Sequence, residues 1–109
     1  MRREREGTLL RIFLGDSDRH EGRPLHQVLV ERAHAMGLTG ATVLHGQAGF
    51  GRHTRLHTAK LLELSSDLPL VIEIVDTEAK IREFLVAVDA CMFEGLVTLE
   101  TVRILEFPE

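Results

Sequence analysis

The sequence predicts an α+β fold, a single sheet with two helices, in which the order strand–helix–strand occurs twice. Two stretches have apolar residues at helical spacing, the first beginning near Pro24 and the second near Asp76. Strand-like apolar runs precede and follow each stretch. Each helical stretch also ends in Gly-Leu, at Gly37-Leu38 and Gly95-Leu96, and glycine just beyond a helix is a common C-terminal cap.

The first predicted strand is Thr8–Leu14. Its side chains alternate, so Leu10, Ile12 and Leu14 point one way, while Leu9 and Phe13 point the other way with Arg11 between them. Both faces of this strand are therefore mostly apolar. Residues 1–7 are polar and are expected to form a flexible N-terminal arm, which leaves residues 8–107 as a single domain.

The first helix is expected to begin at Pro24, where the missing N–H is not needed, and to end at Gly37. Its stripe consists of Leu25, Val28, Leu29, Arg32, Ala33 and Met36. The charged loop Gly15–Gly22 lacks the ligand pattern of an EF-hand and is expected to be a solvated turn. Gly40–His45 is the second predicted strand.

The second half begins with a segment, Ala59–Leu64, that reads as a further strand or a short helical piece. Leu68–Val75 is a strand with Pro69 at its start. Asp76 or Thr77 is expected to cap the second helix, which Gly95 ends. The helical stripe is Ile81, Phe84, Leu85, Val88 and Met92, and the last strand is Val97–Phe107.

This order favours a ferredoxin-like βαββαβ arrangement, one antiparallel sheet with both helices on one face. Right-handed crossovers require the two helices to lie on the same side. The other face then has no helix to cover it, although its residues do not alternate cleanly to polar. We hypothesise that this face packs against copies of itself in a closed cyclic oligomer.

The composition excludes several classes of protein. The chain has 109 residues, a formal net charge of −4, five Phe and no Trp or Tyr, so nucleic acid is not expected as a partner. A single cysteine, Cys91, excludes an intramolecular disulfide and a multi-cysteine metal site. No apolar run is long enough to span a bilayer and no signal peptide is recognisable, so a cytoplasmic location is expected.

The segment from Gly46 to Thr58 is the predicted centre of function. Gly46, Gly49 and Gly51 permit a backbone nest for an anion, and Arg52 and Arg55 would add contacts to phosphate or carboxylate. The alternative is a flexible glycine loop with two solvated arginines.

Other polar residues give weaker signals. His53 and His57 are four residues apart, as metal-binding histidines in a helix are, but no Glu follows His53 and no metal site is predicted. For His57 we expect a hydrogen bond within the loop or a ligand contact. Glu73 is either a cleft carboxylate or, as we favour, half of an ion pair with an arginine that fixes the assembly.

No catalytic set is recognisable. Ser65 and Ser66 lack the setting of a nucleophile elbow, and Cys91 is expected to be packed in a helix. We therefore predict no catalytic residues and a protein that is not an enzyme.

Four segments together resemble a small bacterial and archaeal family of unknown function in the PII-like signalling superfamily. The resemblance covers about Gly7 to Phe107, and the segments are Leu9–Gly15, Gly46-x-x-Gly49-Phe50-Gly51, Leu56–Lys60 and Asp67–Asp76. It implies a PII-like βαββαβ fold and a homotrimer with the three sheets packed inside. It also implies a small ligand, often an adenine nucleotide, between subunits.

In PII-like proteins a loop after the second strand docks onto target proteins, frequently membrane transporters. Here that loop corresponds to about Gln47–Thr58, and without any Tyr it cannot be modified at a tyrosine. Family members are often found near membrane proteins of the fluoride-exporter type. The ligand-binding residues predicted for this chain are Gly46, Gly49, Phe50, Gly51, Arg52, Arg55, His57 and Glu73, and no cofactor is identified.

The leading interpretation is a PII-like regulatory or sensor protein that binds an anionic ligand and presents this loop to a partner. The second is a small enzyme of ferredoxin-like architecture with His53 or His57 as acid or base. The third is a structural accessory subunit without a ligand.

Overall fold

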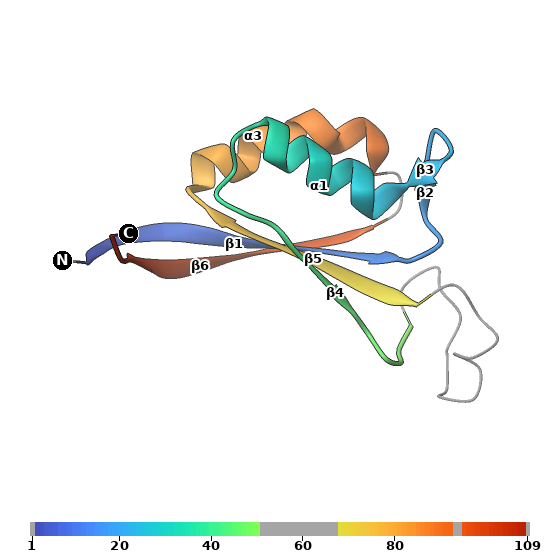
Figure 1. Ribbon diagram of the computed structural model, residues 1–109, viewed down its shortest axis with the longest axis horizontal. Helices are drawn as coiled ribbons and strands as arrows, with labels where there is room; N and C mark the ends of the chain where they lie inside the picture. Colours follow the sequence, from blue (N-terminus) through green and yellow to red (C-terminus); the bar gives the residue numbers. More distant parts are fainter. Residues whose placement is uncertain (1, 51–67, 93–94, 109) are drawn as a thin grey trace.

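The described part of the chain forms a four-stranded antiparallel sheet with two helices packed on one of its faces (Figure 1). The computed structural model describes residues 2–50, 68–92 and 95–108. The strand order is β4-β5-β1-β6, with β4 at Thr42–His45, β5 at Pro69–Asp76, β1 at Arg3–Gly15 and β6 at Leu96–Glu106. The helices are α1, Leu25–Ala35, and α3, Glu78–Val88. The predicted α+β, ferredoxin-like arrangement is confirmed.

The centre of the sheet is β1, which pairs with a neighbour on each side. It pairs with β5 from Thr8↔Asp76 to Gly15↔Pro69, and with β6 from Arg3↔Glu106 to Phe13↔Leu96. Strand β4 pairs with β5 alone. Because β1 and β4 are both antiparallel to β5, their C-terminal ends meet at the same end of the sheet.

The core lies between the sheet and the helices. It comprises alternate residues of the two central strands and one stripe from each helix: Leu10, Ile12, Leu14, Leu70, Ile72, Ile74, Leu25, Leu29, Ala33, Ile81, Phe84 and Val88. Burial follows the geometric period of each element, as the alternation of Leu10, Ile12 and Leu14 predicted. From the predicted stripe of the first helix, Val28 and Arg32 lie outside this core.

The ends of the helices follow from local chemistry. At the end of α1 the amide of Leu38 donates to the carbonyl of Ala33, and that of Gly37 donates to His34. With Gly37 at φ +76°, this is a Schellman motif, as the glycine predicted. Thr77 caps α3 by accepting a hydrogen bond from the amide of Lys80. The second helix ends earlier than expected, since a 3-10 turn, η1 (Asp89–Cys91), follows Val88 before Gly95.

Residues 3–7 are the clearest correction. They were expected to form a loose arm but instead form the first part of β1, opposite the end of β6. Oppositely charged side chains face each other across the two strands, with Arg5 Nε 2.6 Å from Glu106 Oε1 and Arg103 Nε 3.6 Å from Glu4 Oε2. A polar sequence can thus form a strand through cross-strand pairs without burying a side chain in the core.

The loop after β1 is also more ordered than a solvated turn. It contains a two-stranded hairpin, β2 (Arg19–His20) and β3 (Arg23–Pro24). The two residues of its turn, Glu21 and Gly22, have φ of 51° and 81°, as tight hairpin turns with a right-handed twist require. The predicted segment Ala59–Leu64 lies outside the described residues.

Candidate functional site

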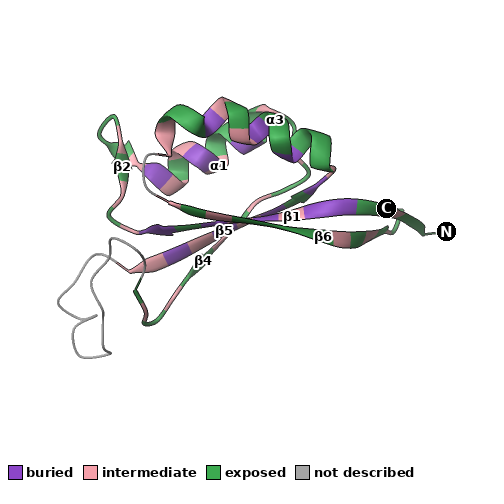
Figure 2. Cartoon of the chain, turned by 180° about the vertical axis from the view of Figure 1, so that it is seen from behind, coloured by how far each residue is buried: buried purple, intermediate pink, exposed green. Residues whose placement is uncertain are grey.

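Helices α1 and α3 lie on one face of the sheet, and none of the described helices or strands covers the opposite face (Figures 1 and 2). Alternation along β1 and its pairing with β5 and β6 place on this open face the side chains of Leu9, Phe13, Leu44, Val71, Val75, Leu96, Val102 and Ile104. Phe13 is 36% exposed, Val75 37%, Leu44 47% and Leu96 50%. In a single chain this face is therefore an apolar surface in contact with water.

A charged cluster lies between the apolar side chains of the open face. Arg11 Nε donates to Glu73 Oε2 at 2.9 Å and Arg11 Nη1 donates to Glu100 Oε1 at 3.1 Å. The hydrogen bond that Arg11 donates to Glu73 raises the pKa of Arg11, and the negative charges of Glu73 and Glu100 raise it further, against the opposing effect of desolvation. The arginine partner expected for Glu73 is thus present, and the pair lies on the open face.

The segment that begins at Gly46 leaves the sheet at a defined point, which we call the loop root: Asp16, His26, His45, Gly46 and Pro69. The amide of Gly46 donates to the carbonyl of Pro69 at 2.8 Å, and the amide of Asp16 donates to Leu68 at 2.7 Å. A Cβ on Gly46 would lie 2.8 Å from Pro69 Cγ, so the close approach of β4 and β5 here requires glycine.

Two histidines and one aspartate gather at the loop root. His45 Nε2 is 3.9 Å from Asp16 Oδ1, and the rings of His45 and His26 are 6.4 Å apart, edge to face. Nδ1 of His26 is buried without a hydrogen-bond partner among the described residues. These groups can donate or accept hydrogen bonds to a polar ligand. Within the same described ranges, no group of three or more His, Cys, Asp or Glu is placed to hold a metal ion.

Sequence reasoning missed Asp16 and His26 as neighbours of the segment. The available signal was topological. Polar residues stand at the C-terminal ends of two strands that point the same way, Asp16 after β1 and His45 on β4. In a ferredoxin-like order both lie at one end of the sheet, and the short connection from β1 brings the start of α1 there too.

Of the predicted ligand-binding residues, the structure describes Gly46, Gly49, Phe50 and Glu73, and Glu73 lies apart from the other three. Gly46 is at the loop root, Gly49 follows with φ +143°, and Phe50 is 70% exposed. Glu73 is four residues along β5 from Pro69, roughly 13 Å away at ~3.3 Å per residue, and its carboxylate is bound by Arg11. Gly51, Arg52, Arg55 and His57, together with His53, lie outside the described residues.

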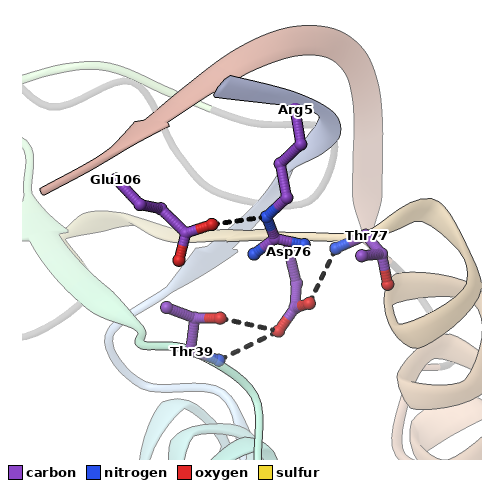
Figure 3. Close-up of polar contacts among 5 residues, drawn as sticks. All are labelled: Arg5, Thr39, Asp76, Thr77 and Glu106. Carbon is purple, nitrogen blue, oxygen red and sulfur yellow. Dashed lines mark hydrogen bonds and ion pairs between the residues drawn. The ribbon is translucent and has the colours of Figure 1, made fainter. Parts of the chain in front are cut away.

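A second polar cluster, around Asp76, has a structural role (Figure 3). Asp76 is 4% exposed. One of its oxygens accepts from the amide of Thr77 at 2.7 Å, and the other accepts from the amide and the hydroxyl of Thr39 at 2.9 and 3.0 Å. Burial alone would raise the pKa of Asp76, but these hydrogen bonds and the charge of Lys80 outweigh it and lower that pKa. Asp76 therefore ties the connection after α1 to the start of α3.

The outer side of α3 has one shallow hollow of about 390 Å³, lined by Arg82, Leu85, Val86 and Asp89. Its two charged residues, Arg82 and Asp89, are exposed. Across residues 2–50, 68–92 and 95–108, no helix combines the length and apolar character that crossing a membrane requires.

Comparison with known proteins places the chain in a family. The model of the DUF190 family, described as "Uncharacterized ACR, COG1993", matches residues 7–104. A UPF0166 protein of Aquifex aeolicus is 43% identical over 97 residues, which cover 89% of this chain and 91% of that protein. A UPF0166 protein of Methanocaldococcus jannaschii is 32% identical over 80 residues, 73% of each chain.

Solved structures share the fold at low sequence identity. CPII, a nitrogen regulatory PII-like protein from Thiomonas intermedia K12 bound to ADP, AMP and bicarbonate, superposes with a TM-score of 0.69 at 15% identity, covering 94% of this chain and 91% of that one. Its apo form gives a TM-score of 0.65 at 12% identity, with 97% and 99% covered. The chain thus has the fold of PII-like proteins.

Proposed function

Because the chain belongs to the DUF190 family and has the fold of PII-like proteins, we propose that it is a PII-like regulatory protein. It assembles through the open face of its sheet, as a trimer, and binds a small anionic ligand between subunits. The segment Gln47–Thr58 is presented to a partner protein. The proposal gives the chain no catalytic role.

The observation that carries the proposal is the open face. Both helices lie on one side of the sheet, and the apolar side chains on the other side remain up to half exposed in a single chain. Exposed apolar surface of this kind is characteristic of protein–protein interaction sites. In a closed ring of copies, each open face would be covered by its neighbours.

The loop root supports the position proposed for the ligand. The segment begins with Gly46, which packs closely against Pro69, and continues through Gly49 at φ +143°. Asp16, His26 and His45 lie beside its start. The related fold of CPII has been solved with ADP, AMP and bicarbonate bound. For this chain we propose that an adenine nucleotide or a similar anion contacts Gly46, Gly49, Phe50 and Gly51, with Arg52, Arg55 and His57 supplying side-chain contacts. Glu73 accepts a hydrogen bond from Arg11, and in this proposal the pair stabilises the assembly.

Regulation requires that ligand and partner favour one conformation of the segment. A ligand shifts a conformational equilibrium only by the difference in its affinity for the two states. The proposed partner is a membrane transporter, which would bind Gln47–Thr58 in the ligand-free or the ligand-bound conformation, but not equally well in both.

Isothermal titration of the purified assembly tests the ligand. We expect saturable binding of ADP, AMP or ATP. Gly49→Val should weaken this binding because valine does not readily adopt the positive φ of Gly49, and Arg55→Ala should weaken it because the variant lacks a cation. Arg82→Ala is the control, because it removes an exposed arginine on α3 that lies outside the segment Gln47–Thr58. This variant should bind the nucleotide as wild type does. If no nucleotide or bicarbonate binds, the ligand part of the proposal is wrong, and the structural accessory subunit becomes the better interpretation.

A further inference from the structure

The charged cluster occupies the middle of the open face rather than its rim. Arg11 stands between Leu9 and Phe13 on β1, and its cross-strand neighbour Glu73 stands between Val71 and Val75 on β5. Glu100, on the edge strand β6, pairs diagonally with Arg11. Any molecule that covers the open face must therefore cover these three charges as well.

The three side chains are unequally shielded in one chain. The side chains of Arg11 and Glu73 are 36% and 31% exposed, whereas that of Glu100 is 61% exposed and holds one bond of 3.1 Å to Arg11. One cation faces two carboxylates, so the cluster carries a formal charge of −1. Glu100 is thus the more exposed carboxylate, and its hydrogen bond with Arg11 is longer than that of Glu73.

A purely apolar partner fits this surface poorly. It would remove water from Glu100 without giving the carboxylate a new hydrogen bond, and burying an unpaired charge is costly. The bonds to Glu73 and Glu100 use two of the five N–H groups of the Arg11 guanidinium. A second copy of this chain brings a guanidinium of that kind, together with a matching apolar surface.

From this geometry we propose that the open face recognises a second copy through an ion pair between copies, in which Arg11 of one chain donates to Glu100 of the next. In a closed ring every chain gives one such pair and receives one, so the charges fix how neighbouring sheets are placed while the apolar side chains supply the contact area. The inference depends on the proposed assembly and adds the residues that make it selective.

Two opposite charge changes test the pair. Arg11→Glu leaves three carboxylates in the cluster, and Glu100→Arg leaves two arginines beside Glu73. Each variant alone should assemble at least tenfold more weakly than wild type by sedimentation velocity. Glu83→Arg, the same change at an exposed position on α3, is the matched control and should assemble as wild type does.

Mixing the two variants separates contacts between copies from contacts within one chain. The carboxylate introduced at position 11 of one chain would then meet the guanidinium introduced at position 100 of the next. Native mass spectrometry should therefore find mixed assemblies in excess of a statistical distribution. The recovery should be incomplete in a trimer, because a ring of three leaves one contact between like variants.

Three results decide the matter. If both variants assemble as tightly as wild type, or mixed species only match statistics while circular dichroism shows folded chains, the pairing is wrong. If Arg11→Glu does not fold, Glu100→Arg alone must still weaken assembly for the inference to stand. If the wild-type chain itself stays monomeric, the proposed assembly fails, which is a different outcome from an assembly that is indifferent to these charges.

Discussion

The amide of Gly46 donates to the carbonyl of Pro69 at 2.8 Å, and this bond closes the segment of the chain between β4 and β5. The same two residues approach so closely that a Cβ on Gly46 would lie 2.8 Å from Pro69 Cγ. The end of the sheet from which the proposed ligand loop leaves is thus fixed by backbone contact. A side chain at position 46 would push the two strands apart.

Gly46→Val should therefore destabilise the protein and displace the start of the loop. Overpacking of this kind costs about 1–3 kcal/mol, which urea denaturation measures directly. Gly40→Val is a matched control, because a Cβ at Gly40 meets nothing within 4 Å. Equal stabilities for the two variants would contradict the tight approach at the loop root.

Phe84→Ala should be the most destabilising single change among the helix residues. Phe84 is fully buried on the side of α3 that faces the sheet, and removing a buried aromatic ring costs about 3–5 kcal/mol. Val86→Ala, on the same helix at 78% exposure, should change the free energy of unfolding by less than about 0.5 kcal/mol. Thermal and urea unfolding of the two variants test whether the outer side of α3 is uncovered.

Asp76→Asn should lower stability at neutral pH by about 1–3 kcal/mol, because an amide NH₂ would replace an oxygen that accepts hydrogen bonds. The pKa of Asp76 is lowered in the folded chain. The contribution of the ionised Asp76 carboxylate to the free energy of unfolding is therefore complete above the ordinary pKa of an aspartate. It is lost as the pH falls through the lower, folded-state pKa.

The difference in unfolding free energy between wild type and Asp76→Asn should accordingly shrink on acidification from about pH 5 downward, the range in which an unfolded aspartate begins to protonate. Asp89→Asn, at an exposed position on η1, supplies the control titration. A difference that stays constant to low pH would show that the carboxylate charge of Asp76 does not stabilise the connection to Thr39.

Phe13→Asp should weaken the assembly and leave the fold of the chain intact. The side chain is 36% exposed on the open face, so the change places a charge in the proposed interface rather than in the core. Val86→Asp on α3 makes the same kind of change away from that face. Size-exclusion chromatography with light scattering over a dilution series should show dissociation for the first variant alone.

The sequence predicted the fold because burial leaves a periodic record. Leu10, Ile12 and Leu14 alternate along β1, and Gly37 stands where α1 ends. It did not predict that residues 3–7 extend β1, because their partners are charged side chains about a hundred residues away, as in Arg5 and Glu106. Pairing between charged exposed strands has no local pattern.

Part of the candidate site could also be predicted from the sequence. Glu73 was expected to need an arginine, and the β-sheet register supplies Arg11 directly opposite. The residues around Gly46 could not be predicted from the sequence. Asp16, His26 and His45 become neighbours only because β1 and β4 finish at the same end of the sheet. The bonds between Asp76 and Thr39 likewise join residues 37 positions apart.

Sedimentation equilibrium of the wild-type chain at micromolar concentration is the most direct measurement of the central claim, that copies of this chain cover the open face of its sheet. The single chain has a mass of 12.3 kDa. We expect one species at three times that mass, which dissociates when Phe13 is changed to Asp. A wild-type chain that sediments as a monomer throughout would contradict the claim.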